Sequence, residues 1–131
     1  MKKTKADNLQ KILLLVGAIG LIPIALSYGL IPEQSMAYLY DISVSSINLT
    51  HILRAVMGLY LAMLLFWFIG AFNTQLRQAA IYSLIIFMLG LAFGRIISLI
   101  IDGVPNSLLL IYLALELLLG VLGLLLVQKS S

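Results

Sequence analysis

Four long apolar runs, separated by short polar stretches, account for most of the sequence. They cover residues 12–30, 49–72, 79–101 and 108–127. Each is close to the roughly 20 residues that a helix needs to cross the hydrocarbon core of a bilayer. The pattern therefore predicts an all-α membrane protein, an up-down bundle of four transmembrane helices in one domain over residues 1–131.

The links between the runs differ in length. Residues 73–78 and 102–107 form short links, which force the runs on either side to be antiparallel neighbours. The second of these contains Gly103 and Pro105, residue types that favour a turn. The link 31–48 is long and mixes apolar with polar side chains. A short amphipathic stretch on the membrane surface and a plain ordered loop both fit it.

Lysine and arginine outside the runs predict the orientation, because they gather on the cytoplasmic side of a membrane. The positive charges lie before the first run, in the link 73–78 and after the last run: Lys2, Lys3, Lys5, Lys11, Arg77 and Lys129. The other two links carry only acidic residues: Glu33, Asp41 and Asp102. This bias predicts that both termini lie in the cytoplasm.

The first run has a second interpretation. Its lysine-rich start, its apolar core and the small-residue pattern Ala25-Leu26-Ser27 also fit a cleavable signal peptide. We favour a membrane span.

Composition agrees with a membrane protein and narrows the chemistry. The 131 residues are 63% hydrophobic and 10% charged, whereas soluble domains average about 45–50% apolar and about 25% charged. With no cysteine and one histidine, disulfides, thiolate metal sites and a bis-histidine haem within one chain are excluded. We therefore expect no cofactor and no metal.

Motifs for catalysis and for nucleic-acid binding are missing from the sequence as well. It contains no phosphate-binding loop, no zinc-binding histidine pair and no dinucleotide fingerprint, so we expect no enzyme. It has no basic stripe with interleaved aromatic residues, so we expect no nucleic-acid partner.

Three charges lie inside the apolar runs. Glu116 sits near the middle of the last run, where a carboxylate costs about 2.5–3.5 kcal/mol on insertion scales. Arg95 precedes Val104, the centre of the last link, by nine residues, and Glu116 follows it by twelve. At ~1.5 Å per residue their depths differ by only about 4–5 Å, so the sequence predicts an Arg95–Glu116 pair. Arg54 lies roughly 7 Å inside the second run, where it either joins this pair or snorkels to the outer head groups.

Helical spacing of three or four residues adds neighbours to this polar cluster. The candidate site residues are Arg54, Arg95, Glu116, Ser98, Asp102, His51 and Tyr112. Simpler roles stay open for several of them. Arg95 and Glu116 also fit a structural ion pair that sets the helix register, Asp102 fits a cap or turn residue, and His51 fits an interfacial residue.

Two further patterns concern packing. Gly90 and Gly94 form a G-x-x-x-G step, which favours close approach of two helices. The tyrosines and Trp67 fit interface belts and packing.

The charge balance of the cluster leads to a functional hypothesis. Two arginines against one glutamate leave a positive charge in a low-dielectric setting, which favours an anionic or strongly polar head group from the outer leaflet. A quinone, a lipid head group or a carboxylate of a partner subunit would fit. We expect an accessory or binding module for a polar-headed lipophilic ligand or a membrane partner, surrounded by membrane lipids. The alternative is a small transporter or channel that acts as a homo-oligomer; a membrane enzyme has no nucleophile or metal site to support it.

Three separated motifs carry a family resemblance. They are Arg54-Ala55-Val56-Met57-Gly58-Leu59-Tyr60, then Gly94-Arg95-Ile96-Ile97-Ser98 followed by Asp102-Gly103-Val104-Pro105, and finally Glu116. Together they resemble a bacterial domain-of-unknown-function family of short four-helix membrane proteins, in the general style of DoxX-like proteins. The resemblance implies a four-helix inner-membrane protein without an established activity, and no motif here carries over the oxidoreductase association of DoxX.

Overall fold

The computed structural model describes the backbone of residues 2–130 and the side chains of residues 5–128. The described chain is helical and has no strand, as the sequence predicts. Its helices are α1 (Lys2–Gly29), α2 (Pro32–Tyr40), α3 (Ile47–Phe72), α4 (Thr74–Ile101) and α5 (Ser107–Ser130). Four of them are long and apolar enough to cross a membrane, over Lys5–Gly29, Ile47–Phe72, Thr74–Ile101 and Ser107–Gln128.

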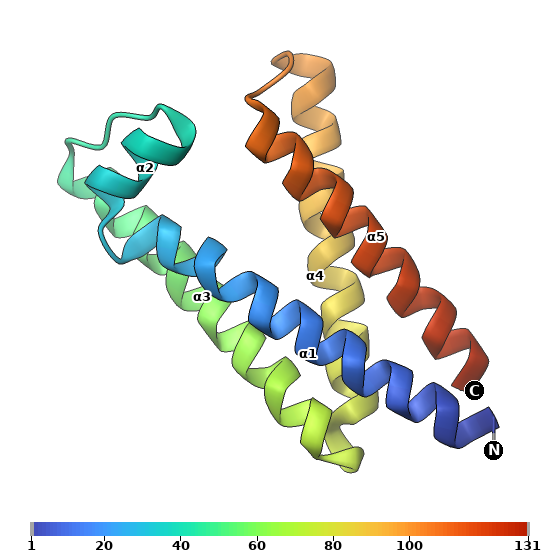
Figure 1. Cartoon of the computed structure of the whole chain (residues 1–131). Helices are drawn as coiled ribbons and strands as arrows, with labels where there is room; N and C mark the ends of the chain where they lie inside the picture. The colour runs from blue at the N-terminus through green and yellow to red at the C-terminus, as the bar shows by residue number, and fades with distance from the viewer. Residues whose placement is uncertain (1, 131) are drawn as a thin grey trace.

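The four long helices alternate in direction. Both termini and the α3–α4 junction lie at one end of the bundle, here called the termini end (Figure 1). The short helix α2 and the α4–α5 turn lie at the other end, here called the α2 end. The predicted up-down bundle is confirmed.

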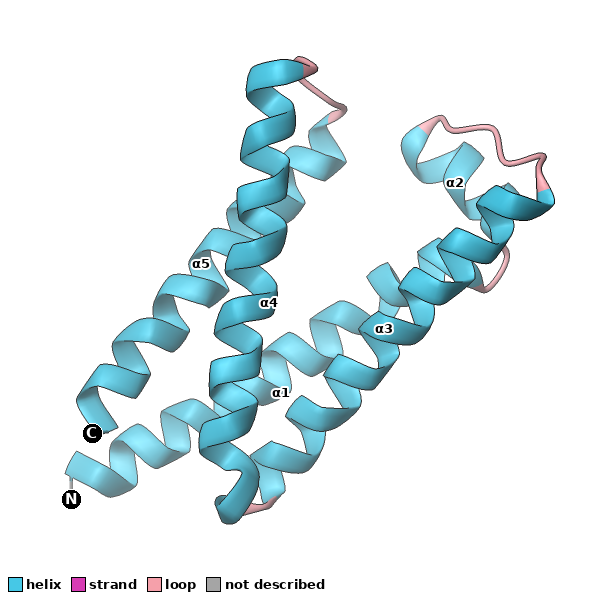
Figure 2. Ribbon diagram, turned by 180° about the vertical axis from the view of Figure 1, so that it is seen from behind, coloured by secondary structure: helices cyan, strands magenta, loops and turns pink. Residues whose placement is uncertain are grey.

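The helices pack as two pairs that diverge. Helix α1 lies along α3, and α4 lies along α5. The pairs are close together near the termini end and separate toward the α2 end (Figures 1 and 2). The backbones of the two pairs are therefore farthest apart in the half of the bundle near α2 (Figures 1 and 2).

The tightest core lies in the half of the bundle near the termini. Leu14 and Trp67 are fully buried there, and Trp67 Nε1 donates a hydrogen bond to Ser83 Oγ at 3.0 Å. The rings of Trp67 and Tyr60 both lie edge-on to Phe87, with centroids 5.4 and 5.1 Å away. The packing that the sequence predicts for the aromatic residues is therefore confirmed for Trp67 and Tyr60.

Helices α4 and α5 approach each other closely at two glycines of α5, Gly120 and Gly123. A Cβ at Gly120 would lie 2.5 Å from Leu89 Cδ2, and one at Gly123 would lie 2.6 Å from Ile85 Cγ1. By contrast, a Cβ at Gly90 or Gly94 would meet nothing within 4 Å. The prediction that the G-x-x-x-G step packs against a helix is wrong, because α4 turns these two glycines toward the space between the helix pairs.

The link predicted over residues 73–78 is a single residue. The Asn73 side chain accepts hydrogen bonds from the backbone N–H groups of Gln75 at 2.9 Å and Leu76 at 3.3 Å. An asparagine in this position satisfies amides that the first helical turn otherwise leaves unpaired. Helix α4 therefore starts at Thr74, and Arg77 lies in its first turn and not in a loop.

Arg77 is buried and holds the termini end together. Its Nη1 lies 2.7 Å from Asp7 Oδ1 on α1. Its Nε and Nη2 donate to the carbonyls of Gly70 at 3.1 Å and Ala71 at 2.7 Å, at the end of α3. Its charge is thus not an exposed loop charge, as the orientation argument assumed. The side chains of Lys2, Lys3 and Lys129, which entered the same argument, lie outside the described residues.

The long link contains α2, which is amphipathic. Pro32, Met36 and Tyr40 are buried along one face of this helix. Asn106, just before α5, donates from Nδ2 to the Leu39 carbonyl at 3.2 Å. The link therefore contains a short amphipathic helix and is not a plain loop throughout, and α2 packs onto the α2 end of the bundle.

Candidate functional site

The centre of the candidate site is an ion pair between α4 and α5. Arg95 Nε donates to both carboxylate oxygens of Glu116, at 2.9 and 3.2 Å. The Glu116 side chain is 9% exposed and the Arg95 side chain 22%, so the pair is largely buried. Residue spacing on either side of Val104 predicts this pair, and the contact between the two side chains confirms it.

A chain of hydroxyl groups holds an aromatic ring against the arginine. The Arg95 guanidinium lies 5.6 Å from the centre of the Tyr112 ring, in cation–π range. The Tyr112 hydroxyl is 3.0 Å from that of Tyr40, which is 3.1 Å from Ser27 Oγ. The chain links α5, α2 and α1. Spacing along one helix cannot find Tyr40 or Ser27, because both belong to helices distant in sequence.

Arg54 does not join this pair, and the prediction of a three-residue cluster is wrong. Its Nη1 donates to the Gly29 carbonyl at the end of α1, at 2.7 Å. The reason is the divergence of the helix pairs, which moves the start of α3 away from α4. With Glu116 opposite Arg95 alone, the pair is neutral, and the predicted surplus of positive charge is absent from it.

Ser98, Asp102 and His51 lie around the site in different ways. Ser98 lies one turn from Arg95 and its hydroxyl donates to Asp102 Oδ2 at 2.7 Å. Asp102 ends α4, where its backbone N–H donates to the Ser98 carbonyl at 2.7 Å, so it is a cap residue. His51 is exposed on α3 near Arg54 and away from the Arg95–Glu116 pair.

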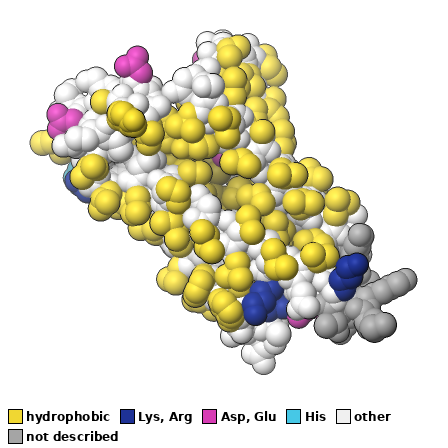
Figure 3. Space-filling model, in the orientation of Figure 1, with side chains coloured by type: hydrophobic (Ala, Val, Ile, Leu, Met, Phe, Trp, Pro, Cys, Tyr) yellow, Lys and Arg dark blue, Asp and Glu magenta, His cyan; other side chains and the backbone are white. Residues whose placement is uncertain are grey.

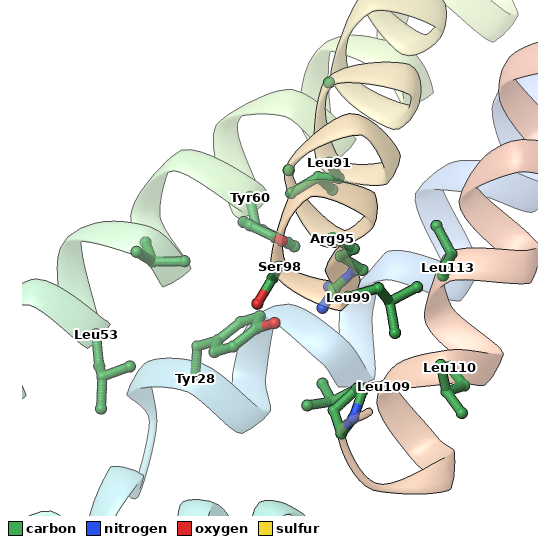
Figure 4. Close-up of a pocket in the computed structure, with 14 residues that line it drawn as sticks. Tyr28, Leu53, Tyr60, Leu91, Arg95, Ser98, Leu99, Leu109, Leu110 and Leu113 are labelled. Carbon is green, nitrogen blue, oxygen red and sulfur yellow. The ribbon is translucent and has the colours of Figure 1, made fainter. Parts of the chain in front are cut away.

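A pocket of about 430 Å³ lies between the helix pairs, and Arg95 forms part of its wall. We call it the Arg95 pocket. Leucines from α3, α4 and α5 are the commonest residues in its lining, which also includes Gly90 and Gly94 of α4. Figure 4 shows the Arg95 guanidinium and the hydroxyls of Tyr28 and Ser98 pointing into it. The pocket thus combines an apolar wall with a few polar groups gathered at one place.

A second, smaller pocket lies between α1 and α5. It measures about 230 Å³, and Glu116, Tyr112 and Gly20 contribute to its otherwise apolar lining. Figure 3 shows the molecule hollowed on the face that carries α1 and α5. Because Arg95 lines the first pocket and Glu116 the second, the ion pair forms a wall between them, together with Tyr60, which lines both.

Fold and site together define a small four-helix protein of membrane type with a buried ion pair beside an apolar pocket. The chain belongs to the family described as "Domain of unknown function (DUF4345)", whose model matches residues 9–127. That range contains all three motifs on which the resemblance rests, and the resemblance to a family of unknown function is confirmed. No curated protein and no solved structure matches the chain.

Proposed function

We propose that this protein is a non-enzymatic binding module that holds a lipophilic ligand in the Arg95 pocket. The observation that carries the proposal is the guanidinium of Arg95 facing an apolar pocket of about 430 Å³ between two helix pairs. Pockets for small molecules have typical volumes of about 300–1,000 Å³, with apolar walls and a few convergent polar groups. The Arg95 pocket has this character.

The donors in the pocket select the head group of the ligand. A guanidinium has five N–H donors and no acceptor, and both hydrogen bonds to Glu116 come from Arg95 Nε. The rest of the Arg95 guanidinium and the Tyr28 hydroxyl face the pocket. The Ser98 hydroxyl lies beside them, but its hydrogen is donated to Asp102, so toward a ligand it can only accept. Because Glu116 balances the charge of Arg95, the ligand needs acceptor oxygens and no full negative charge. A quinone carbonyl or a lipid ester meets this requirement.

The two glycines of α4 supply a route from the lipid. Gly90 and Gly94 are exposed, and a Cβ atom added at either glycine would have no neighbour within 4 Å. A tail can therefore extend sideways between α3 and α4 into the surrounding bilayer while the head group stays at Arg95.

Filling this route tests the proposal. Gly90→Leu and Gly94→Leu place side chains in open space, so they should leave the fold and the ion pair intact. Gly58→Leu is the matched control, because Gly58 also has open space but lines neither the Arg95 pocket nor the pocket between α1 and α5. The measurement is native mass spectrometry of protein purified in mild detergent, with identification of the extracted ligand.

We expect the parent and Gly58→Leu to retain one ligand, and each pocket-filling variant to lose about tenfold or more in occupancy, equivalent to about 1.4 kcal/mol. A parent without ligand, or pocket variants that retain it fully, would contradict the proposal.

We further propose that the termini end is cytoplasmic, in a bacterial inner membrane. Lys5 and Lys11 lie near the termini end, whereas Glu33, Asp41 and Asp102 lie at the α2 end, and positive residues favour the cytoplasmic side. A fluorescent reporter fused after Ser131 should be active, and an alkaline phosphatase inserted within residues 41–46 should be active as well. Phosphatase activity at the terminus, with none from the insertion, would reverse the orientation.

The transporter alternative has less support from the geometry. Leu14 and Trp67 are fully buried in the half near the termini, so the space between the helices of one chain is filled there. Transport would need several copies of the chain, whereas binding needs only the pocket of one.

A further inference from the structure

We propose a second site, at the α2 end, that binds the zwitterionic head group of a phospholipid with a primary ammonium group. This inference goes beyond the proposed function and uses different residues. A cavity of about 660 Å³ lies between the start of α2, the segment that follows α2 and the first turns of α3. We call it the Arg54 pocket. Its charged and titratable residues are Glu33, His51 and Arg54, and Ser45, Ser46 and Thr50 add hydroxyls.

Arg54 brings a positive charge that no carboxylate of the described side chains balances. Its hydrogen bond to the Gly29 carbonyl, at 2.7 Å, fixes the side chain but leaves the charge uncompensated. The ion pairs among side chains 5–128 are Arg77–Asp7 and Arg95–Glu116. Arg54 and Glu33 therefore line one cavity with opposite charges and without pairing to each other.

Capping of α1 is a simpler role for Arg54, and it accounts for part of the arrangement. Gly29 approaches α3 so closely that a Cβ would lie 2.7 Å from Met57 Cβ, and Arg54 Nη1 satisfies its carbonyl there. This role uses one guanidinium nitrogen. It explains neither the presence of His51 nor that of Glu33 on the same cavity wall.

A zwitterion matches this wall better than a ligand of one sign. Guanidinium groups bind phosphate through charge-assisted hydrogen bonds, and the N–H of a neutral or charged imidazole can add another. A phosphate at Arg54 and His51 leaves Glu33 to accept from a primary ammonium. An anion alone would leave Glu33 unpaired beside it, and a cation alone would do the same to Arg54.

The position of the cavity matches the head-group layer. Arg54 lies about 10 Å from the first residue of α3 along the helix axis, near the end of a membrane span. Leu30, Ile31 and Ile47 contribute to the cavity and are 55%, 55% and 78% exposed. These apolar side chains offer a surface to the acyl chains. Figure 3 shows a histidine and a basic side chain together at the edge of this end, with an acidic side chain above them.

The test compares three phospholipids with identical acyl chains. Delipidated parent protein is titrated with phosphatidylethanolamine, phosphatidylcholine and phosphatidylglycerol, and binding is measured by native mass spectrometry. The choline head group has no N–H donor, and the glycerol head group has no ammonium. We expect about tenfold tighter binding of phosphatidylethanolamine than of either other lipid, because only its ammonium donates to Glu33.

Variants assign the effect to the cavity. Arg54→Gln should weaken binding of phosphatidylethanolamine and phosphatidylglycerol alike, because it removes the phosphate contact. Glu33→Gln should remove the preference for phosphatidylethanolamine and leave phosphatidylglycerol unaffected or bound more tightly. Asp102→Asn, an exposed acid at the same end but outside this pocket, is the control and should change nothing. Melting temperatures equal to that of the parent show that the variants are folded. If Arg54→Gln unfolds, Arg54→Lys is used in its place, because lysine keeps the positive charge but lacks the planar guanidinium.

Two outcomes overturn the proposal. One is equal binding of the three lipids by the parent, and the other is a preference that survives Glu33→Gln. Competition with soluble O-phosphoethanolamine separates a lipid from a free phosphate ester as the ligand. We expect it to compete at least about tenfold more weakly than the lipid, because it lacks acyl chains, and equal competition would overturn the assignment to a lipid. Gly90→Leu should leave the lipid preference unchanged, so failure at this site and failure at the Arg95 pocket are distinguishable.

Discussion

Replacing Glu116 by alanine should lower the free energy of unfolding by about 2–4 kcal/mol, one of the two largest effects that we expect. The change leaves the Arg95 guanidinium largely buried without its carboxylate. Breaking a buried pair from one side costs about 3–5 kcal/mol in soluble proteins, and polar contacts in membranes contribute less, because the unfolded chain also finds partners there. Glu116→Gln should cost less than alanine, because its amide oxygen still accepts from Arg95 Nε.

Thermal unfolding in detergent measures this difference. Leu118→Ala is a suitable control, because Leu118 is on the same helix and 55% exposed. The double variant Arg95→Gln with Glu116→Gln should recover part of the loss of the single variant Arg95→Gln, since no buried charge remains unpaired. Identical melting temperatures for the parent, Glu116→Ala and Glu116→Gln would show that this pair contributes nothing to the fold.

Arg77→Met should also destabilise the protein by about 2–4 kcal/mol, through contacts at the termini end of the bundle. Methionine roughly keeps the apolar volume but removes the donors to the Gly70 and Ala71 carbonyls. Each buried acceptor left unpaired costs about 1–3 kcal/mol. The expected result is a lower melting temperature together with faster hydrogen exchange at the α3–α4 junction.

Asp7→Asn separates the carbonyl contacts of Arg77 from its ion pair. The Asp7 side chain is 48% exposed, and exposed pairs contribute only about 0–1 kcal/mol. Asp7→Asn should therefore cost much less than Arg77→Met. Two results would contradict the proposed role of Arg77 in capping the end of α3. One is an equal loss of stability in the two variants, and the other is a melting temperature of Arg77→Met equal to that of the parent.

Sequence alone determined the features that depend on position along a helix axis. Run length and polarity predicted the four spans, and the residue spacing on either side of Val104 predicted the Arg95–Glu116 pair. Both follow from a nearly constant rise per residue, which converts distance in the sequence into depth. Depth alone gave a wrong prediction for Arg54. It does not say whether α3 and α4 are close together at that level, and at the α2 end the two helices diverge.

Tertiary structure decided everything that depends on how the helices rotate and cross. It turned Gly90 and Gly94 toward a pocket while Gly120 and Gly123 formed the close contact. It also buried Arg77 against the end of α3 and the start of α1, although the sequence predicted that this residue lies in a link between helices. The crossing angle and the facing side of each helix result from side-chain packing across all of them at once. No single run of this sequence carries that information, and it is the packing that creates both the Arg95 pocket and the Arg54 pocket.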